Sequence, residues 1–179
     1  MIRDFSVHPK AQNNNSKILM SAFFGVAIAA FVVSLFMDAY TWVAGMVIFA
    51  SLITAIFVYT KYVSVEFYYD VAVEGMAEPL FIVRQLIGRR NVTLCRVALA
   101  DIKEIRRETD EERRLHKTPK NTALFVYMPT LMPKVCYRVY VNDGFDKSEL
   151  LLEGSEEFFK ELLLLANEAR ALRGEGEEE

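Results

Sequence analysis

Two histidines, two cysteines and a group of arginines are the residues of this chain whose types could support chemistry. His8 and His116 are the only histidines among the 179 residues, and each lies in a stretch expected to be exposed and flexible. A serine or cysteine nucleophile needs a histidine held in fixed geometry, which a mobile charged segment does not provide. Cys95 and Cys136 lie in apolar runs, where a lone thiol behaves as a small core residue. We therefore predict no catalytic site and no enzymatic activity.

The patterns that hold metals and cofactors are also missing from the sequence. There is no Cys-x-x-Cys, no His-x-x-x-His, no acidic calcium loop, and no glycine-rich phosphate loop followed by Lys-Ser or Lys-Thr. Acidic residues outnumber basic ones by 24 to 21, which argues against a strongly basic nucleic-acid-binding protein. We predict no metal ion, no cofactor and no nucleic-acid partner.

Basic side chains are the candidate binding residues. The segment from Pro79 to Ala100 contains arginines but no acid, and a Gly-Arg-Arg-Asn turn places two of them at a hairpin tip. Guanidinium groups suit phosphate oxygens, and the inner leaflet of a cell membrane is anionic. The candidate contacts for anionic head groups or a partner are Arg84, Arg89, Arg90, Arg96, Lys134 and Arg138. The alternative is a set of exposed arginines offset by Glu104, Glu108, Asp110, Glu111 and Glu112.

Two long uncharged runs near the N-terminus predict a transmembrane helical hairpin within residues 17–61. Residues 18–37 and 42–60 carry no charge, and as helices each would cover roughly 30 Å, the thickness of a bilayer's hydrocarbon core. A buried hairpin in a soluble protein is the first alternative, but a domain this small cannot surround two such helices. A cleavable signal peptide is the second, but its apolar region is shorter and is not followed by another.

The basic residues beside the two runs predict their orientation. Arg3, Lys10 and Lys17 precede the first run and Lys61 follows the second, while the connecting loop carries no basic residue. The positive-inside rule therefore predicts a two-pass membrane protein with both termini, including residues 1–16, in the cytoplasm. Pairs of small residues four apart suit close helix packing, either within the hairpin or in a homo-oligomer.

Residues 62–173 are predicted to form one cytoplasmic domain. Residues 62–74 alternate between apolar and mixed polar side chains, as a half-buried antiparallel strand does. Ser155 and Gly174 are the predicted start and stop of an amphipathic helix, and the acidic tail 174–179 is predicted to be disordered. Further strands are predicted at 80–87, 92–99, 102–107, 123–128, 135–141 and 147–153, and the charged residues 108–121 are predicted to form a loop or a short helix.

About seven strands followed by one amphipathic helix is the order of elements in a pleckstrin-homology-like (PH-like) domain. The segment RRNVTLCRVALADIKEIRR, residues 89–107, resembles a stretch of bacterial PH-domain-like membrane proteins, in which a transmembrane hairpin precedes the domain. The resemblance implies a plasma-membrane protein with a membrane α-helical hairpin plus an α+β domain: a PH-like antiparallel β-barrel or sandwich with a C-terminal capping helix. A different α+β sheet covered by one helix is the structural alternative. The basic loop with which eukaryotic PH domains bind phosphoinositides is not matched, because residues 75–79 contain no basic residue.

These observations predict a non-enzymatic, membrane-anchored PH-like module that serves protein interaction or assembly at the cytoplasmic face. Its expected partners are the lipid bilayer and either a protein partner or a second copy bound through the hairpin. One alternative is a module that senses anionic lipid. Another is a small accessory subunit of a larger membrane complex.

Overall fold

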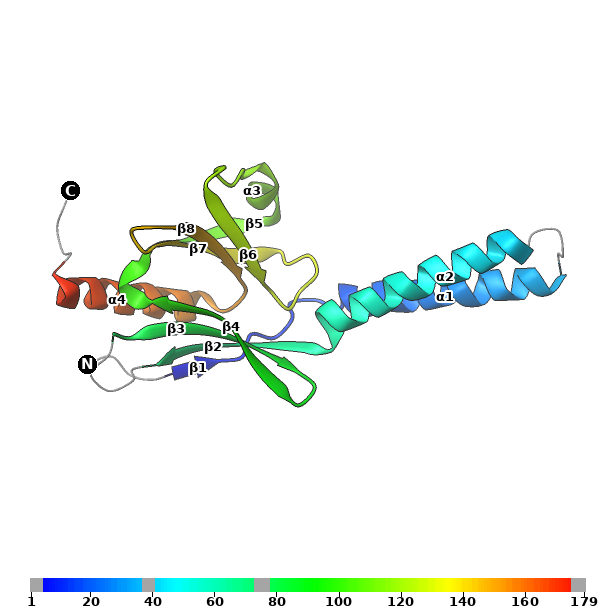
Figure 1. Cartoon of the computed structure of the whole chain (residues 1–179), viewed down its shortest axis with the longest axis horizontal. Helices are drawn as coiled ribbons and strands as arrows, with labels where there is room; N and C mark the ends of the chain where they lie inside the picture. The colour runs from blue at the N-terminus through cyan, green and yellow to red at the C-terminus, as the bar shows by residue number, and fades with distance from the viewer. Residues whose placement is uncertain (1–4, 37–40, 73–77, 175–179) are drawn as a thin grey trace. The chain divides into compact units, whose positions relative to one another are not determined.

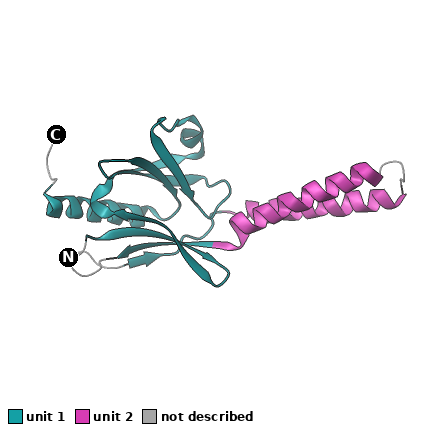
Figure 2. Ribbon diagram, in the orientation of Figure 1, with its two compact units in different colours: residues 1–12, 66–179 teal, residues 13–65 magenta. Residues whose placement is uncertain are grey.

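The structure is a computed structural model that describes residues 5–36, 41–72 and 78–174. It divides into two compact units, residues 13–65 and residues 1–12 with 66–179 (Figure 2). We refer to the second unit as the β domain. Of the predicted connection 38–41 and the predicted disordered tail 174–179, only Thr41 and Gly174 are among the described residues.

The unit formed by residues 13–65 is a helical hairpin. α1 (Asn15–Phe36) and α2 (Thr41–Val58) pack against each other, and a π-helical turn (Tyr59–Val63) extends α2. Small side chains dominate the contact, because the buried positions in the apolar stretches are Ala27 of α1 and Ala44, Ser51, Ala55 and Val58 of α2, and only Val58 is larger. Most large apolar side chains are exposed on both helices. Both helices are therefore long and apolar enough to cross a membrane.

The first sheet of the β domain has the strand order β1-β2-β3-β4 (Figure 1). Its strands are β1 (Phe5–Val7), β2 (Val65–Ala72), β3 (Leu80–Ile87) and β4 (Arg90–Ala98). The alternation predicted for β2 is confirmed, since Phe67, Tyr69 and Val71 point into the core. β1 was not predicted: Phe5–Val7 pairs antiparallel with β2, so the N-terminal segment belongs to this sheet.

The second sheet has the strand order β5-β7-β8-β6. Its strands are β5 (Ile102–Thr109), β6 (Thr122–Tyr127), β7 (Val135–Asn142) and β8 (Lys147–Leu152). The short helix η3 (Leu99–Asp101) connects β4 of the first sheet to β5 of the second. β7 pairs antiparallel with β5 and β8, but β6 pairs parallel with β8 and not with β7, its successor in sequence. The chain therefore passes over β8 between β6 and β7, which leaves β6 at one end of the sheet.

The predicted C-terminal helix is confirmed as α4 (Glu156–Arg173). The Ser155 hydroxyl accepts a hydrogen bond from the Phe158 backbone N–H, and Gly174 ends the helix with a φ of 82°, a left-handed conformation that favours glycine. The first turn of α4 contacts both sheets. Phe158 packs on the rings of Phe5 and Tyr69, and Phe159 stacks on Tyr137 of β7 with ring centroids 4.0 Å apart.

The β domain has an α+β architecture with two sheets and a C-terminal helix. All seven predicted strands are present. The first begins at Val65, three residues later than predicted, and its predicted end at residue 74 lies outside the described residues, whereas the ends of the other six move by no more than two residues. In the described part of the chain the two four-stranded sheets do not close into a barrel. The parallel pairing of β6 also departs from the all-antiparallel arrangement that the resemblance implied.

Candidate functional site

Three buried charged side chains meet on one face of the second sheet. Arg138 on β7 lies between Glu108 on β5 and Glu149 on β8, and none of the three is more than 2% exposed. The strand register places them together. Glu149 is opposite Tyr140 and Glu108 is opposite Cys136, and both of these residues are two positions from Arg138, so all share one face.

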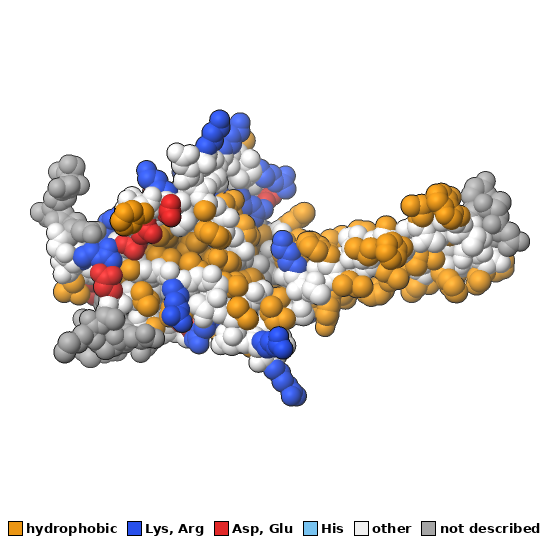
Figure 3. Space-filling view, in the orientation of Figure 1, with side chains coloured by type: hydrophobic (Ala, Val, Ile, Leu, Met, Phe, Trp, Pro, Cys, Tyr) orange, Lys and Arg blue, Asp and Glu red, His pale blue; other side chains and the backbone are white. Residues whose placement is uncertain are grey.

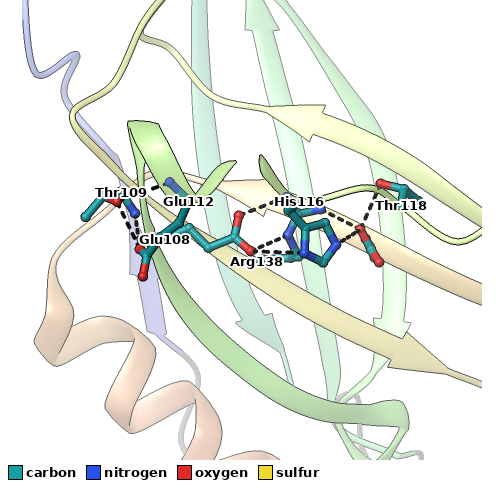
Figure 4. Close-up of polar contacts among 7 residues, drawn as sticks. Glu108, Thr109, Glu112, His116, Thr118 and Arg138 are labelled. Atoms are coloured by element: carbon teal, nitrogen blue, oxygen red, sulfur yellow. Dashed lines mark hydrogen bonds and ion pairs between the residues drawn. The ribbon is translucent and has the colours of Figure 1, made fainter. Parts of the chain in front are cut away.

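Each of the three nitrogens of the Arg138 guanidinium donates a hydrogen bond to a carboxylate. Its Nε and Nη2 donate to the two carboxylate oxygens of Glu108 at 2.7 and 2.8 Å, and its Nη1 donates to Glu149 (Figure 4). Burial by itself lowers the pKa of Arg138, but the hydrogen bonds to the two carboxylates outweigh burial, so its pKa lies above the usual value. Arg138 therefore stays charged and compensates two carboxylates that would otherwise be costly to bury.

Residues 110–121 cover this face of the sheet. The segment begins with α3 (Asp110–Leu115), which starts at a capping box. The Thr109 hydroxyl accepts from the Glu112 backbone N–H, while the Glu112 carboxylate accepts from the Thr109 backbone N–H at 2.8 Å. The segment predicted to be a loop or a short helix is thus a short helix followed by an irregular stretch.

The irregular stretch is attached to the buried carboxylates. His116 Nε2 lies 3.6 Å from the Glu149 carboxylate and Nδ1 lies 3.9 Å from Glu108. The Thr118 hydroxyl donates a hydrogen bond to Glu149 at 3.2 Å. The sequence analysis expected His116 to lie on an exposed mobile segment, and this is wrong. Two carboxylates and the Tyr140 ring lie around its imidazole. We call Glu108, Arg138, Glu149 and His116 the charge cluster.

The charge cluster is arranged to hold the covering segment on the sheet. Its carboxylates are engaged by Arg138 and Thr118, and Cys136 nearby has a thiol whose pKa is raised by burial, which keeps the thiol protonated and a poor nucleophile. Among the described residues no three His, Cys, Asp or Glu side chains are placed to hold a metal ion. The geometry therefore points to a structural role for the cluster.

The structure separates the predicted basic contact residues. Arg89 and Arg90 are exposed at the β3–β4 turn, and Arg96 is exposed six residues further along β4, about 20 Å away at the rise of a strand. Arg84 Nε donates to Asp70 on β2, and 41% of the Arg84 side chain remains exposed. Exposed Lys134 lies on the connection between β6 and β7.

Arg138 must be withdrawn from the set of surface contact residues. Its side chain is 2% exposed, and its donors are used by Glu108 and Glu149. The sequence analysis also treated Glu108 as one of the acids that offset exposed arginines. Its side chain is instead buried and paired with Arg138. The exposed candidates that remain are Arg84, Arg89, Arg90, Arg96 and Lys134.

A further buried carboxylate, outside the charge cluster, fixes the N-terminal segment. Glu153 is 1% exposed and accepts hydrogen bonds from the Thr130 N–H at 3.1 Å, the Thr130 hydroxyl at 2.6 Å and the Gln12 N–H at 3.1 Å. The His8 ring stacks on Tyr68 at 4.6 Å, so the segment that carries it is not the flexible terminus that the sequence analysis expected. Burial raises the pKa of Glu153, although its hydrogen-bond donors oppose this shift.

β6 is an edge strand with exposed apolar side chains. Leu124, Phe125 and Val126 are 44%, 43% and 53% exposed, and Thr122–Tyr127 contains no charged residue. Figure 3 shows apolar side chains gathered across the middle of the β domain. Charged edge residues normally prevent a sheet from pairing with another strand, and β6 lacks them.

The sequence analysis missed the charge cluster and the exposed edge of β6. Residues 123–128 form an uncharged apolar run, which favours a buried strand, and local sequence carries no sign that β6 lies at the end of a sheet. The charge cluster joins residues up to 41 positions apart, from Glu108 to Glu149, so only the strand register reveals it.

No protein-family model matches the chain, and the curated proteins contain no match to it.

Proposed function

We propose that this chain is a non-enzymatic module, anchored in a membrane by α1 and α2, whose β domain binds a protein partner through β6. The proposed membrane is the plasma membrane, with both termini in the cytoplasm, as the lysines and arginine beside the helices indicate. The two sheets with a C-terminal helix support a PH-like, though unclosed, arrangement.

The observation that carries the proposal is the exposed, uncharged edge of β6. Three adjacent apolar side chains with 43–53% exposure are costly to leave in water along a strand whose outer edge has no strand partner in the described part of the chain. An interaction module needs such a surface, whereas an enzyme would need a nucleophile or acid–base pair in an accessible site. Glu108, Arg138, Glu149 and Glu153 are instead each no more than 2% exposed.

Site-specific photocrosslinking of the full chain in native membranes tests the proposal. A photoreactive residue replaces Val126 on β6, and the matched control replaces Leu164, which is 63% exposed on α4. We expect a protein adduct from position 126 that is absent from position 164 and is lost when Leu124→Lys is added. Equal labelling at both positions, or an adduct that survives Leu124→Lys, contradicts the proposed binding surface.

Binding of anionic lipid is the second candidate function. Arg89 and Arg90 are adjacent and exposed at the β3–β4 turn, where each could add about 1 kcal/mol of attraction to an anionic surface. Cosedimentation of the full chain with vesicles is uninformative, because the helices would insert whatever the lipid charge. The test is therefore whether anionic lipid protects the β3–β4 turn from hydrogen exchange. Hydrogen exchange at residues 88–91 should slow when the nanodisc lipid is changed from phosphatidylcholine to a mixture with phosphatidylglycerol. An exchange rate at residues 88–91 that is the same in both lipid compositions excludes this function.

A further inference from the structure

The backbone of β6 offers a place for one more strand. β6 is the last strand in the order β5-β7-β8-β6 and is paired along all six of its residues with β8 alone. Alternate N–H and C=O groups of an edge strand point away from the sheet and can pair with an added strand. At the two ends of β6 the Thr122 N–H already donates to the Pro119 carbonyl at 3.1 Å and the Tyr127 carbonyl accepts a hydrogen bond from the Tyr69 hydroxyl at 2.6 Å, so the free edge is limited to residues 123–126.

The side chains of β6 define what such a strand would contact. Leu124 and Val126 are in register with Glu149 and Leu151 of β8 and share their face of the sheet. Phe125 lies on the opposite face and stacks with the Tyr127 ring, with centroids 6.1 Å apart. Since both faces present partly exposed apolar groups, an added strand gains contacts from apolar side chains on both of its faces.

The segments that precede and follow β6 in sequence carry only positive charge, although exposed Asp146 lies beside Lys147, the partner of Thr122 on β8. No acidic residue occurs between Glu112 and Asp143, while Lys117, Lys120 and Lys134 in this interval are exposed. Arg138 lies in the same interval but is neutralised within the charge cluster. Lysines therefore flank the apolar strand at its two ends.

The charge pattern discriminates between occupants of the edge. Antiparallel pairing of β6 with β6 of a second copy would bring lysine-bearing flanks together, and like charges disfavour that arrangement. A strand with acidic residues on both sides of an apolar centre would instead gain attraction at both ends.

We propose that β6 binds an extended protein segment whose apolar centre pairs with Leu124–Val126 and whose flanks are acidic. This inference rests on the proposed function and specifies the chemistry of its partner. The segment adds as a fifth strand to the second sheet, with main-chain hydrogen bonds supplying affinity and the lysines supplying selectivity.

The test uses the full chain in phosphatidylcholine nanodiscs and fluorescently labelled synthetic peptides. The probe is acetyl-Asp-Glu-Thr-Val-Ile-Val-Thr-Glu-Asp-amide. One control replaces its four acids with lysine, and another replaces the central isoleucine with proline, which removes a backbone donor. Fluorescence anisotropy gives Kd, and hydrogen exchange shows where the peptide binds.

We expect the acidic peptide to bind about tenfold or more tightly than the lysine-flanked peptide and to slow exchange at residues 122–126. Proline should abolish this protection. The triple substitution Lys117→Glu, Lys120→Glu and Lys134→Glu should reverse the charge preference, and Val126→Glu should remove binding, whereas Leu172→Glu on α4 should leave it intact.

Three results would overturn the inference. They are no binding of the acidic peptide at millimolar concentration, equal affinity for the two flanking charges, and binding that persists with Val126→Glu. If position 126 nevertheless crosslinks to a protein in native membranes, the proposed function stands and only the partner chemistry is wrong. If neither experiment detects a ligand at β6, both proposals fail.

Discussion

Replacing Arg138 with methionine is the substitution whose effect the structure predicts most sharply. The change removes three hydrogen bonds from a guanidinium that is 2% exposed and leaves Glu108 and Glu149 buried without their cation. Breaking a buried ion pair in this way costs about 3–5 kcal/mol, which is a large part of the roughly 5–15 kcal/mol by which a domain is stable. The folded-to-unfolded ratio should therefore fall about 100-fold or more.

The assay is urea unfolding of the full chain in detergent micelles, followed by the near-ultraviolet circular dichroism of its tyrosines. Arg106→Met is the matched control, because Arg106 is exposed on β5 directly opposite Arg138, and it should change the free energy of unfolding by less than about 0.5 kcal/mol. Combining Arg138→Met with Glu108→Leu and Glu149→Leu should recover most of the loss, since no uncompensated charge then remains. Equal effects of Arg138→Met and Arg106→Met would refute the account of the charge cluster.

Three further substitutions test other hydrogen-bonded groups of the β domain. Tyr69→Phe leaves the Tyr127 carbonyl and the Glu153 N–H without their hydroxyl partner and should cost about 1–3 kcal/mol in urea unfolding, while Tyr68→Phe at the sheet surface should cost little. Ser155→Ala removes the cap of α4 and should cost about 1 kcal/mol in the same assay. Burial raises the folded-state pKa of Glu153 above its ordinary 4.5, so the stability contributed by this carboxyl is present below about pH 4.5 and is lost as pH rises through the folded-state pKa. The unfolding free energy of the wild type relative to Glu153→Gln should therefore grow as pH falls, and a flat or opposite trend would contradict this.

Patterns that are local in sequence predicted most of the fold. The uncharged runs 18–37 and 42–60 correspond to α1 and to α2 with the residues just after it, and period-two alternation located β2, because both signals depend on neighbouring residues alone. Ser155 and Gly174 marked the ends of α4 for the same reason. β1 escaped prediction because three residues are too few to show a periodicity.

Features that depend on distant strands could not be predicted in this way. Arg138 and Glu108 looked like surface charges, since nothing in their own segments shows that β5, β7 and β8 are adjacent or that residues 110–121 cover them. The exposure of Leu124–Val126 follows from the place of β6 at the end of the second sheet, and an apolar run has the same composition in a central strand as in an edge strand.

Hydrogen exchange of the intact chain in lipid nanodiscs tests the central claim, that two helices anchor the chain in a bilayer while β6 keeps a free edge. The account predicts strong protection along residues 18–36 and 42–58 that is lost when lipid and detergent are removed, together with fast exchange at the outward amides of residues 123–126. Helices that remain equally protected in lipid-free buffer, or a β6 edge that is already protected without a partner, would contradict it.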